Sequence, residues 1–195
     1  MVCRGLFSLG LKCVVCFVAG VLVLSGLVGC GGAGGPRHVV GAVNGVRPQP
    51  LELPEYPEDL GVEDTAENAI RAAEYFLELM NYTQSSGDTD AYEAVSAAGC
   101  TSCHGFIDRV EELYSSGGFS VGSYTEFDGA TAKRFEKSNA WQIHGDLRIG
   151  EGYRFFPNEK QPLQVVESRY LHNRWILAAV VDGQWQMGML VKDEE

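Results

Sequence analysis

The sequence predicts an α+β domain in which three N-terminal helices pack on a curved antiparallel sheet of four or more strands. Two observations predict this class. Apolar residues recur at three- and four-residue steps between residues 64 and 115, and they alternate at every second position in the segments after Gly118. Helices followed by a meander of strands are typical of a sheet that helices cover on one face.

Residues 1–29 have the layout of an export signal. Arg4 and Lys12 are the only charged residues before position 30, and an apolar run of 16 residues fills positions 13–28. Because roughly 20 residues are needed to span a bilayer, this run favours a cleaved signal peptide over an anchor helix.

The signal segment ends on Leu27-Val28-Gly29-Cys30, which resembles the lipobox of bacterial lipoproteins. The resemblance implies cleavage between Gly29 and Cys30 and lipid chains, such as palmitate, on the Cys30 thiol. Two acyl chains anchor a protein stably, so we expect the membrane as a partner and the outer face of the cell membrane as the location. An unlipidated secretory signal and a retained signal anchor are the alternatives.

Residues 30–60 are rich in glycine and hold five of the seven prolines, which predicts a lipidated cysteine followed by a disordered tether. Residues 61–195 have the length of one domain.

The net charge of the chain limits the kinds of partner that we expect. Loss of the signal removes two of the 15 Lys and Arg residues and none of the 26 Asp and Glu residues. Such an acidic chain argues against nucleic acid as a partner, because phosphate backbones need positive potential.

The helices are predicted in order. The first begins near Asp64, which makes a capping box with Glu67, and it ends at residues 85–88. A short second helix fits residues 90–97. The third runs from Cys103 to Ser115 and is stopped by a pair of glycines.

The strands follow. Weak patterns fit residues 119–127 and 131–137, and a clear alternation covers residues 141–149. The apolar run at residues 175–181 and the alternating run at 185–191 form a hairpin, because Asp182-Gly183 between them is a two-residue turn.

Several motifs carry a family resemblance: Leu53-Pro54-Glu55-Tyr56-Pro57, Tyr75-Phe76, Asn81-Tyr82, Ser86-Gly87-Asp88, Cys100-Thr101-Ser102-Cys103, Ile107 and Glu112-Leu113-Tyr114 before Gly117-Gly118. Over residues 53–191 they are similar to an actinobacterial family of exported lipoproteins with a domain of unknown function, 6318. The order of elements also resembles the cone-like fold of the nuclear-transport-factor-2-like superfamily. The resemblance implies a fold and a location, and it assigns no catalytic residue.

Cys100 and Cys103 are the pair that remains after three cysteines leave with the signal and Cys30 is acylated. In an oxidising compartment we expect a disulfide that joins the second helix to the third. Two alternatives stay open: a thiol–disulfide redox pair at a helix N-terminus, and covalent c-type haem, since His104 completes a C-x-x-C-H pattern.

Two further groups of residues are candidate sites. Tyr75, Tyr124, Trp141 and Trp175 could line a pocket inside the domain, and His144 with Asp146 could make an acid–base pair on one strand face. We see no metal-ligand cluster, nucleophile motif or phosphate loop, and we expect no cofactor.

These observations favour a non-enzymatic, membrane-anchored domain that binds an unknown small molecule or a cell-envelope protein. The alternative is a redox protein that uses the Cys100 to His104 motif.

Overall fold

The structure is a computed structural model, and it describes residues 47–58, 60–136, 138–157, 162 and 164–192. The predicted signal peptide and the proposed lipidation site at Cys30 lie outside the described residues. No helix within the described ranges is long and apolar enough to cross a membrane.

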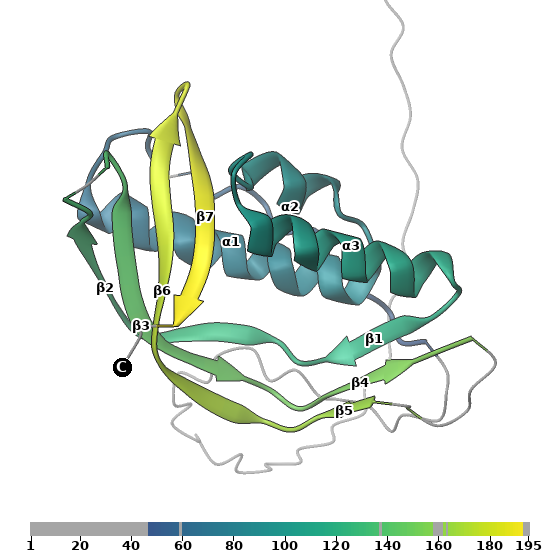
Figure 1. The fold of residues 1–195 in the computed structure, drawn as a ribbon. Helices are drawn as coiled ribbons and strands as arrows, with labels where there is room; N and C mark the ends of the chain where they lie inside the picture. The colour runs from purple at the N-terminus through teal and green to yellow at the C-terminus, as the bar shows by residue number, and fades with distance from the viewer. Residues whose placement is uncertain (1–46, 59, 137, 158–161, 163, 193–195) are drawn as a thin grey trace, which may run out of the picture. The chain divides into compact units, whose positions relative to one another are not determined.

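Helices precede strands in this part of the chain (Figure 1). The helices are α1 (Ala66–Ser86), α2 (Asp90–Val95) and α3 (Thr101–Ser115). The strands are β1 (Phe119–Gly122), β2 (Thr125–Arg134), β3 (Trp141–Ile149), β4 (Gly152–Phe155), β5 (Gln164–Val166), β6 (Arg169–Val181) and β7 (Gln184–Lys192). All strand pairs are antiparallel, which confirms the predicted α+β class.

The strands form two sheets rather than the single sheet that the pattern predicted. One sheet has the order β1-β4-β5 and the other has the order β2-β3-β6-β7. The chain leaves one sheet for the other at Gly122 and Ser123, which both have positive φ angles, 71° and 56°. This break divides the strand predicted over residues 119–127. Of the strand predicted over 131–137, residues 131–134 are the end of β2, and residues 135 and 136 lie beyond it.

The start of α1 differs from the predicted capping box. Thr65, not Asp64, is the N-cap, and its side chain accepts a hydrogen bond from the Asn68 amide at 3.2 Å. Asp64 instead accepts hydrogen bonds from Arg134 at 2.6 Å and from the Trp141 indole at 2.7 Å. A carboxylate with two such partners outside the helix is not available to cap it.

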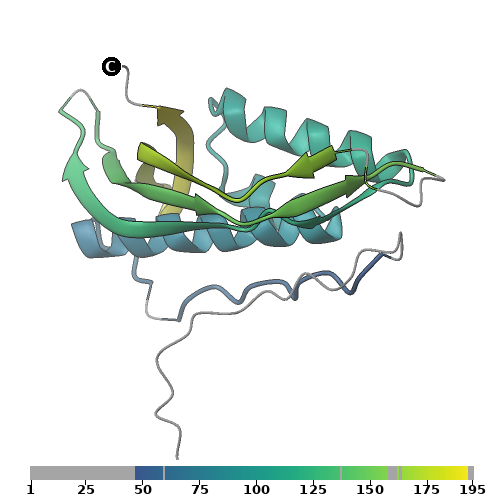
Figure 2. The same ribbon diagram turned by 90° about the horizontal axis from the view of Figure 1, so that it is seen from below.

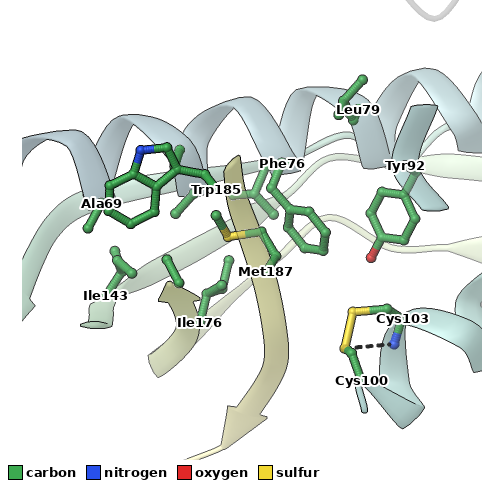
Figure 3. Close-up of a cluster of buried hydrophobic side chains, with 14 of the residues drawn as sticks. Ala69, Phe76, Leu79, Tyr92, Cys100, Cys103, Ile143, Ile176, Trp185 and Met187 are labelled. Carbon is green, nitrogen blue, oxygen red and sulfur yellow. Dashed lines mark hydrogen bonds between the residues drawn. A yellow bond between two sulfur atoms is a disulfide. The ribbon is translucent and has the colours of Figure 1, made fainter. Parts of the chain in front are cut away.

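The core lies where α1 meets the larger sheet (Figure 3). Ala69 and Phe76 of α1 face Trp185 and Met187 of β7, and all four are at most 4% exposed. Their spacing on α1 is the helical period, and their spacing on β7 is the strand period of two. Both periods are visible in the sequence, which is why it predicts both elements.

An extended segment, residues 47–58, runs along α1 on the side away from the strands (Figure 2). The Arg47 guanidinium donates to the Ser86 carbonyl at 2.7 Å, and the Leu51 amide donates to Ser85 Oγ at 3.0 Å. Prolines favour such extended backbone because they fix φ and donate no hydrogen bond. The packed part of the chain therefore begins ahead of residue 61, the boundary that composition predicted.

Candidate functional site

A cavity of about 540 Å³ lies between the C-terminal half of α1, α3, β1 and the residues that follow β4. Its apolar wall consists of Met80, Phe106, Val110, Leu113, Phe156 and Pro157. Its polar lining consists of Gln84, Arg109, Glu112, Tyr114, Ser116, Ser120 and Arg154. By area the lining is more apolar than polar, and a cavity of this volume with such a surface has the character of a small-molecule site.

The face of α3 makes one side of the cavity. Phe106, Val110 and Leu113 follow each other at helical steps of four and three, so their side chains share one face. Gly118 lets the chain turn closely from α3 into β1, since a Cβ there would stand 2.6 Å from Leu113 Cδ1 and 2.7 Å from the Phe155 carbonyl oxygen.

Tyr114 joins the elements around the cavity. Its hydroxyl donates toward the carbonyls of Gln84 at 2.9 Å and Ser85 at 2.8 Å, and it accepts from the Ser120 amide at 3.4 Å. Burial raises the pKa of the Tyr114 phenol, so this group stays protonated and able to donate. One side chain of α3 thus binds both the end of α1 and the start of β1.

The arginines of the lining are placed on opposite elements. Arg109 lies on α3 and Arg154 on β4, and Arg154 donates to Gln164 Oε1 at 3.1 Å. Sequence analysis missed both residues. β4 has only four residues, which is too short for an alternating pattern to reveal it, and Arg109 looked like any solvated position on an amphipathic helix.

None of the four aromatic residues proposed for a pocket lines this cavity. Tyr75 packs edge-on against Tyr56, with ring centroids 5.3 Å apart, and Trp141 donates its indole N–H to Asp64. Tyr124 is half-buried, and burial raises its pKa. Trp175 lies near His144, with ring centroids 6.5 Å apart.

Cys100 and Cys103 are joined by a disulfide at the start of α3. Both are 2% exposed and lie beside Tyr92 in the core (Figure 3). Cys100 is the N-cap, and its sulfur accepts a hydrogen bond from the Cys103 amide at 3.2 Å. The neighbouring His104 ring lies 3.3 Å from the Ala98 carbonyl oxygen. A buried, bonded pair offers no sulfur to an attacking thiol.

Asp146 was proposed as the acid–base partner of His144. In the structure it contacts another histidine, His172. Asp146 Oδ2 lies 2.8 Å from His172 Nδ1, and its Oδ1 accepts from the Asn173 amide at 3.1 Å. These contacts, the His172 hydrogen bond first, lower the pKa of Asp146. His172 was missed because the β3–β6 register shifts between Gly145 and Leu147, and a strand pattern read from sequence assumes an unbroken register.

A shallow depression on the larger sheet includes His144 and Asp146 together with Gly129, Thr131 and Asn173. Among the residues that the structure describes, no group of three or more His, Cys, Asp or Glu side chains could hold a metal ion. The cavity beside α3 is more enclosed than this depression and has the more apolar lining, which makes it the stronger candidate site.

The family model described as "Family of unknown function (DUF6318)" matches residues 48–190. No curated protein and no solved structure matches the chain.

Proposed function

Because this match covers most of its length, the chain belongs to the family of unknown function DUF6318, and on that premise we propose an exported lipoprotein that binds a small molecule. The binding site is the cavity beside α3. The protein acts by binding rather than catalysis.

The cavity is the observation that carries the binding function. Its volume of about 540 Å³ suits a drug-sized molecule, and side chains of α1, α3 and β1 form its walls. Phe156 is 40% exposed at the cavity, so part of its apolar surface is open to a ligand.

Two of the three hydroxyl groups of the lining already donate to backbone carbonyls, which supports binding over covalent catalysis. Tyr114 already donates to the carbonyls at the end of α1, and the Ser116 hydroxyl donates to the Leu113 carbonyl at 2.7 Å. Nucleophilic catalysis would need a hydroxyl that donates to a general base. The Cys100–Cys103 disulfide has a structural part in this proposal.

Export and anchoring are supported by the sequence alone. The apolar run at residues 13–28 and the lipobox-like end at Cys30 favour a protein that is lipid-anchored on the outer face of the cell membrane, as in the actinobacterial lipoproteins that the motifs resemble. Helices that cover curved antiparallel sheets support the likeness to the cone-like fold of nuclear transport factor 2. The fold by itself assigns no ligand.

Titration with a neutral apolar fluorophore, N-phenyl-1-naphthylamine, tests the function. The mature chain, residues 30–195, carries Cys30→Ser so that no acyl chain competes for the cavity. We expect saturable binding at one site, and loss of binding in Ser116→Trp, because Ser116 lines the cavity.

Ser115→Trp is the matched control. Ser115 is also exposed, and it loses a similar hydrogen bond, from its hydroxyl to the Glu112 carbonyl, but it does not line this cavity. Equal binding by the two tryptophan variants, or no saturable binding by the parent chain, would contradict the proposed function.

A further inference from the structure

We infer that the ligand is an anionic amphiphile: a small molecule whose carboxylate, phosphate or sulfate group binds at Arg109 and Arg154 and whose apolar body packs on Phe106, Val110 and Phe156. This inference rests on the proposed binding function and names the class of ligand.

The charge of the lining is opposite to the charge of the chain. The whole sequence has 26 Asp and Glu against 15 Lys and Arg, whereas the lining residues that the structure describes include two arginines and one acid, Glu112. A local excess of positive charge on an acidic protein raises the local concentration of anions at that place.

Neither cavity arginine has a carboxylate partner among the described residues. Elsewhere Arg134 pairs with Asp64 and Arg148 pairs with Glu126. Arg154 has only the neutral oxygen of Gln164, and no described carboxylate oxygen comes within 4.0 Å of the Arg109 guanidinium. A guanidinium in this state has N–H groups left to donate to an anionic oxygen, often as a two-bond fork.

A third cation lies beside the cavity. The guanidinium carbon of Arg47 is 4.9 Å from the centroid of the Tyr114 ring, and Tyr114 is part of the lining. Arg47 is held there by its hydrogen bond to the Ser86 carbonyl. Arg47 does not itself line the cavity, but it adds a positive charge next to one of the lining residues.

The apolar wall of the cavity favours a ligand with an apolar body over an inorganic anion. Val110 is buried, Phe106 is half-buried and Phe156 is 40% exposed, so an apolar body would remove further apolar surface from water. A neutral apolar ligand would leave the arginines without an anionic partner, and a bare anion would leave the wall uncovered. An amphiphile with one negative group satisfies both.

Two fluorophores with the same ring body test the charge. N-phenyl-1-naphthylamine is neutral, and 8-anilinonaphthalene-1-sulfonate adds one sulfonate. We expect the sulfonate to bind about tenfold more tightly to the mature Cys30→Ser chain. Arg109→Gln and Arg154→Gln should each remove most of that advantage, measured for each variant as the ratio of its affinities for the two probes.

Arg169→Gln is the charge-matched control, because Arg169 is an exposed residue of β6 outside the cavity. It should leave both affinities unchanged. Equal affinity for the two probes, or equal effects of all three arginine variants, would overturn the inference while leaving the binding function intact. Failure of both probes to bind would remove the binding function itself.

Competition against the bound sulfonate separates the sources of the anion. Oleate and lysophosphatidate should displace it at micromolar concentrations, and dodecyltrimethylammonium and inorganic phosphate should require at least about a hundredfold more. Displacement by inorganic phosphate at the same concentration as by the amphiphiles would overturn the apolar part of the inference. Displacement by the cationic amphiphile at that concentration would overturn the anionic part.

Discussion

The ring of Tyr114 lies so close to Gly87 that a Cβ at residue 87 would stand 2.3 Å from Tyr114 Cδ1. Gly87 ends α1 in the left-handed conformation, with φ 84°, and its amide donates to the Thr83 carbonyl. The Ser86-Gly87-Asp88 and Glu112-Leu113-Tyr114 motifs therefore contact each other through Gly87 and Tyr114. Tyr114 is also part of the cavity lining.

Gly87→Ala is expected to lower the free energy of unfolding by about 2 kcal/mol or more, because it adds a left-handed alanine and a steric clash. Gly183→Ala is the matched control. Gly183 has φ 78° and no atom within 4 Å of its Cβ position, so it should lose only about 1 kcal/mol. Urea unfolding of both variants gives the comparison, and equal losses would show that the Tyr114 contact contributes nothing.

Tyr114→Phe is expected to lower the free energy of unfolding by about 1–3 kcal/mol, because the carbonyl of Ser85 and the amide of Ser120 lose their partner away from water. Tyr82→Phe removes a hydroxyl that donates to Asp88 Oδ2 at 2.7 Å at an exposed site, and it should cost less. A larger loss in Tyr82→Phe than in Tyr114→Phe would contradict this account of the α1–α3 junction.

Asn81→Asp is expected to destabilise the protein at pH 7 by about 2–3 kcal/mol. The buried Asn81 amide accepts from the Thr125 amide at 2.8 Å and donates to the Thr125 carbonyl at 3.0 Å, so it pairs with β2 as a neighbouring strand would. A carboxylate keeps the first bond and turns the second into repulsion. Asn139→Asp, at an exposed position, is the control.

The Asn81→Asp variant also predicts a pH dependence. Protonation of the new carboxyl restores a donor toward the Thr125 carbonyl, so the deficit relative to the parent chain should shrink as the pH is lowered toward 4. A deficit that stays constant between pH 7 and pH 4 would exclude the carboxylate as its cause.

Asp64 gives a second pH dependence. The hydrogen bond from Arg134 is the main cause that lowers the pKa of Asp64, and the Trp141 indole adds to it. A lowered folded-state pKa means that the stabilisation is present above about pH 4, the unfolded value, and is lost as the pH falls through the folded value. Asp64 is 36% exposed, so the gain is below about 1 kcal/mol.

The measurement is the difference in unfolding free energy between the parent chain and Asp64→Asn, taken at pH 7 and at pH 3. The difference should be larger at pH 7. Asp182→Asn, in the exposed hairpin turn, serves as the control.

The Cys100–Cys103 disulfide should be protected in the folded protein because both residues are 2% exposed. The mature Cys30→Ser chain should give no reaction with a thiol reagent under native conditions, and dithiothreitol should reduce it much faster in urea. The loop is short, so Cys100→Ser with Cys103→Ser should cost less than the roughly 3 kcal/mol of a 15-residue loop. Rapid reduction of the folded protein would favour the redox alternative.

The sequence predicts those helices and strands whose hydrophobic period can be seen within one segment of the chain. α1, α3 and the β6–β7 hairpin carry their own periods, so the sequence alone predicts them. The cavity depends on Arg154 in a four-residue strand and on Phe156 just after it, and neither has a pattern of its own. The Asp146–His172 contact depends on a register shift between strands, which no local pattern encodes.

The extended segment at residues 47–58 also limits the distance between the cavity and the lipid proposed on Cys30. Under the proposed lipidation of Cys30, the interval that matters ends at Arg47 rather than at residue 61, because Arg47, the first residue that the structure describes, is hydrogen-bonded to Ser86. Seventeen residue steps, fully stretched, span at most about 60 Å, against about 110 Å for the longer interval. Since Arg47 lies against Tyr114, the proposed anchor would hold the cavity within about this shorter distance of the bilayer surface.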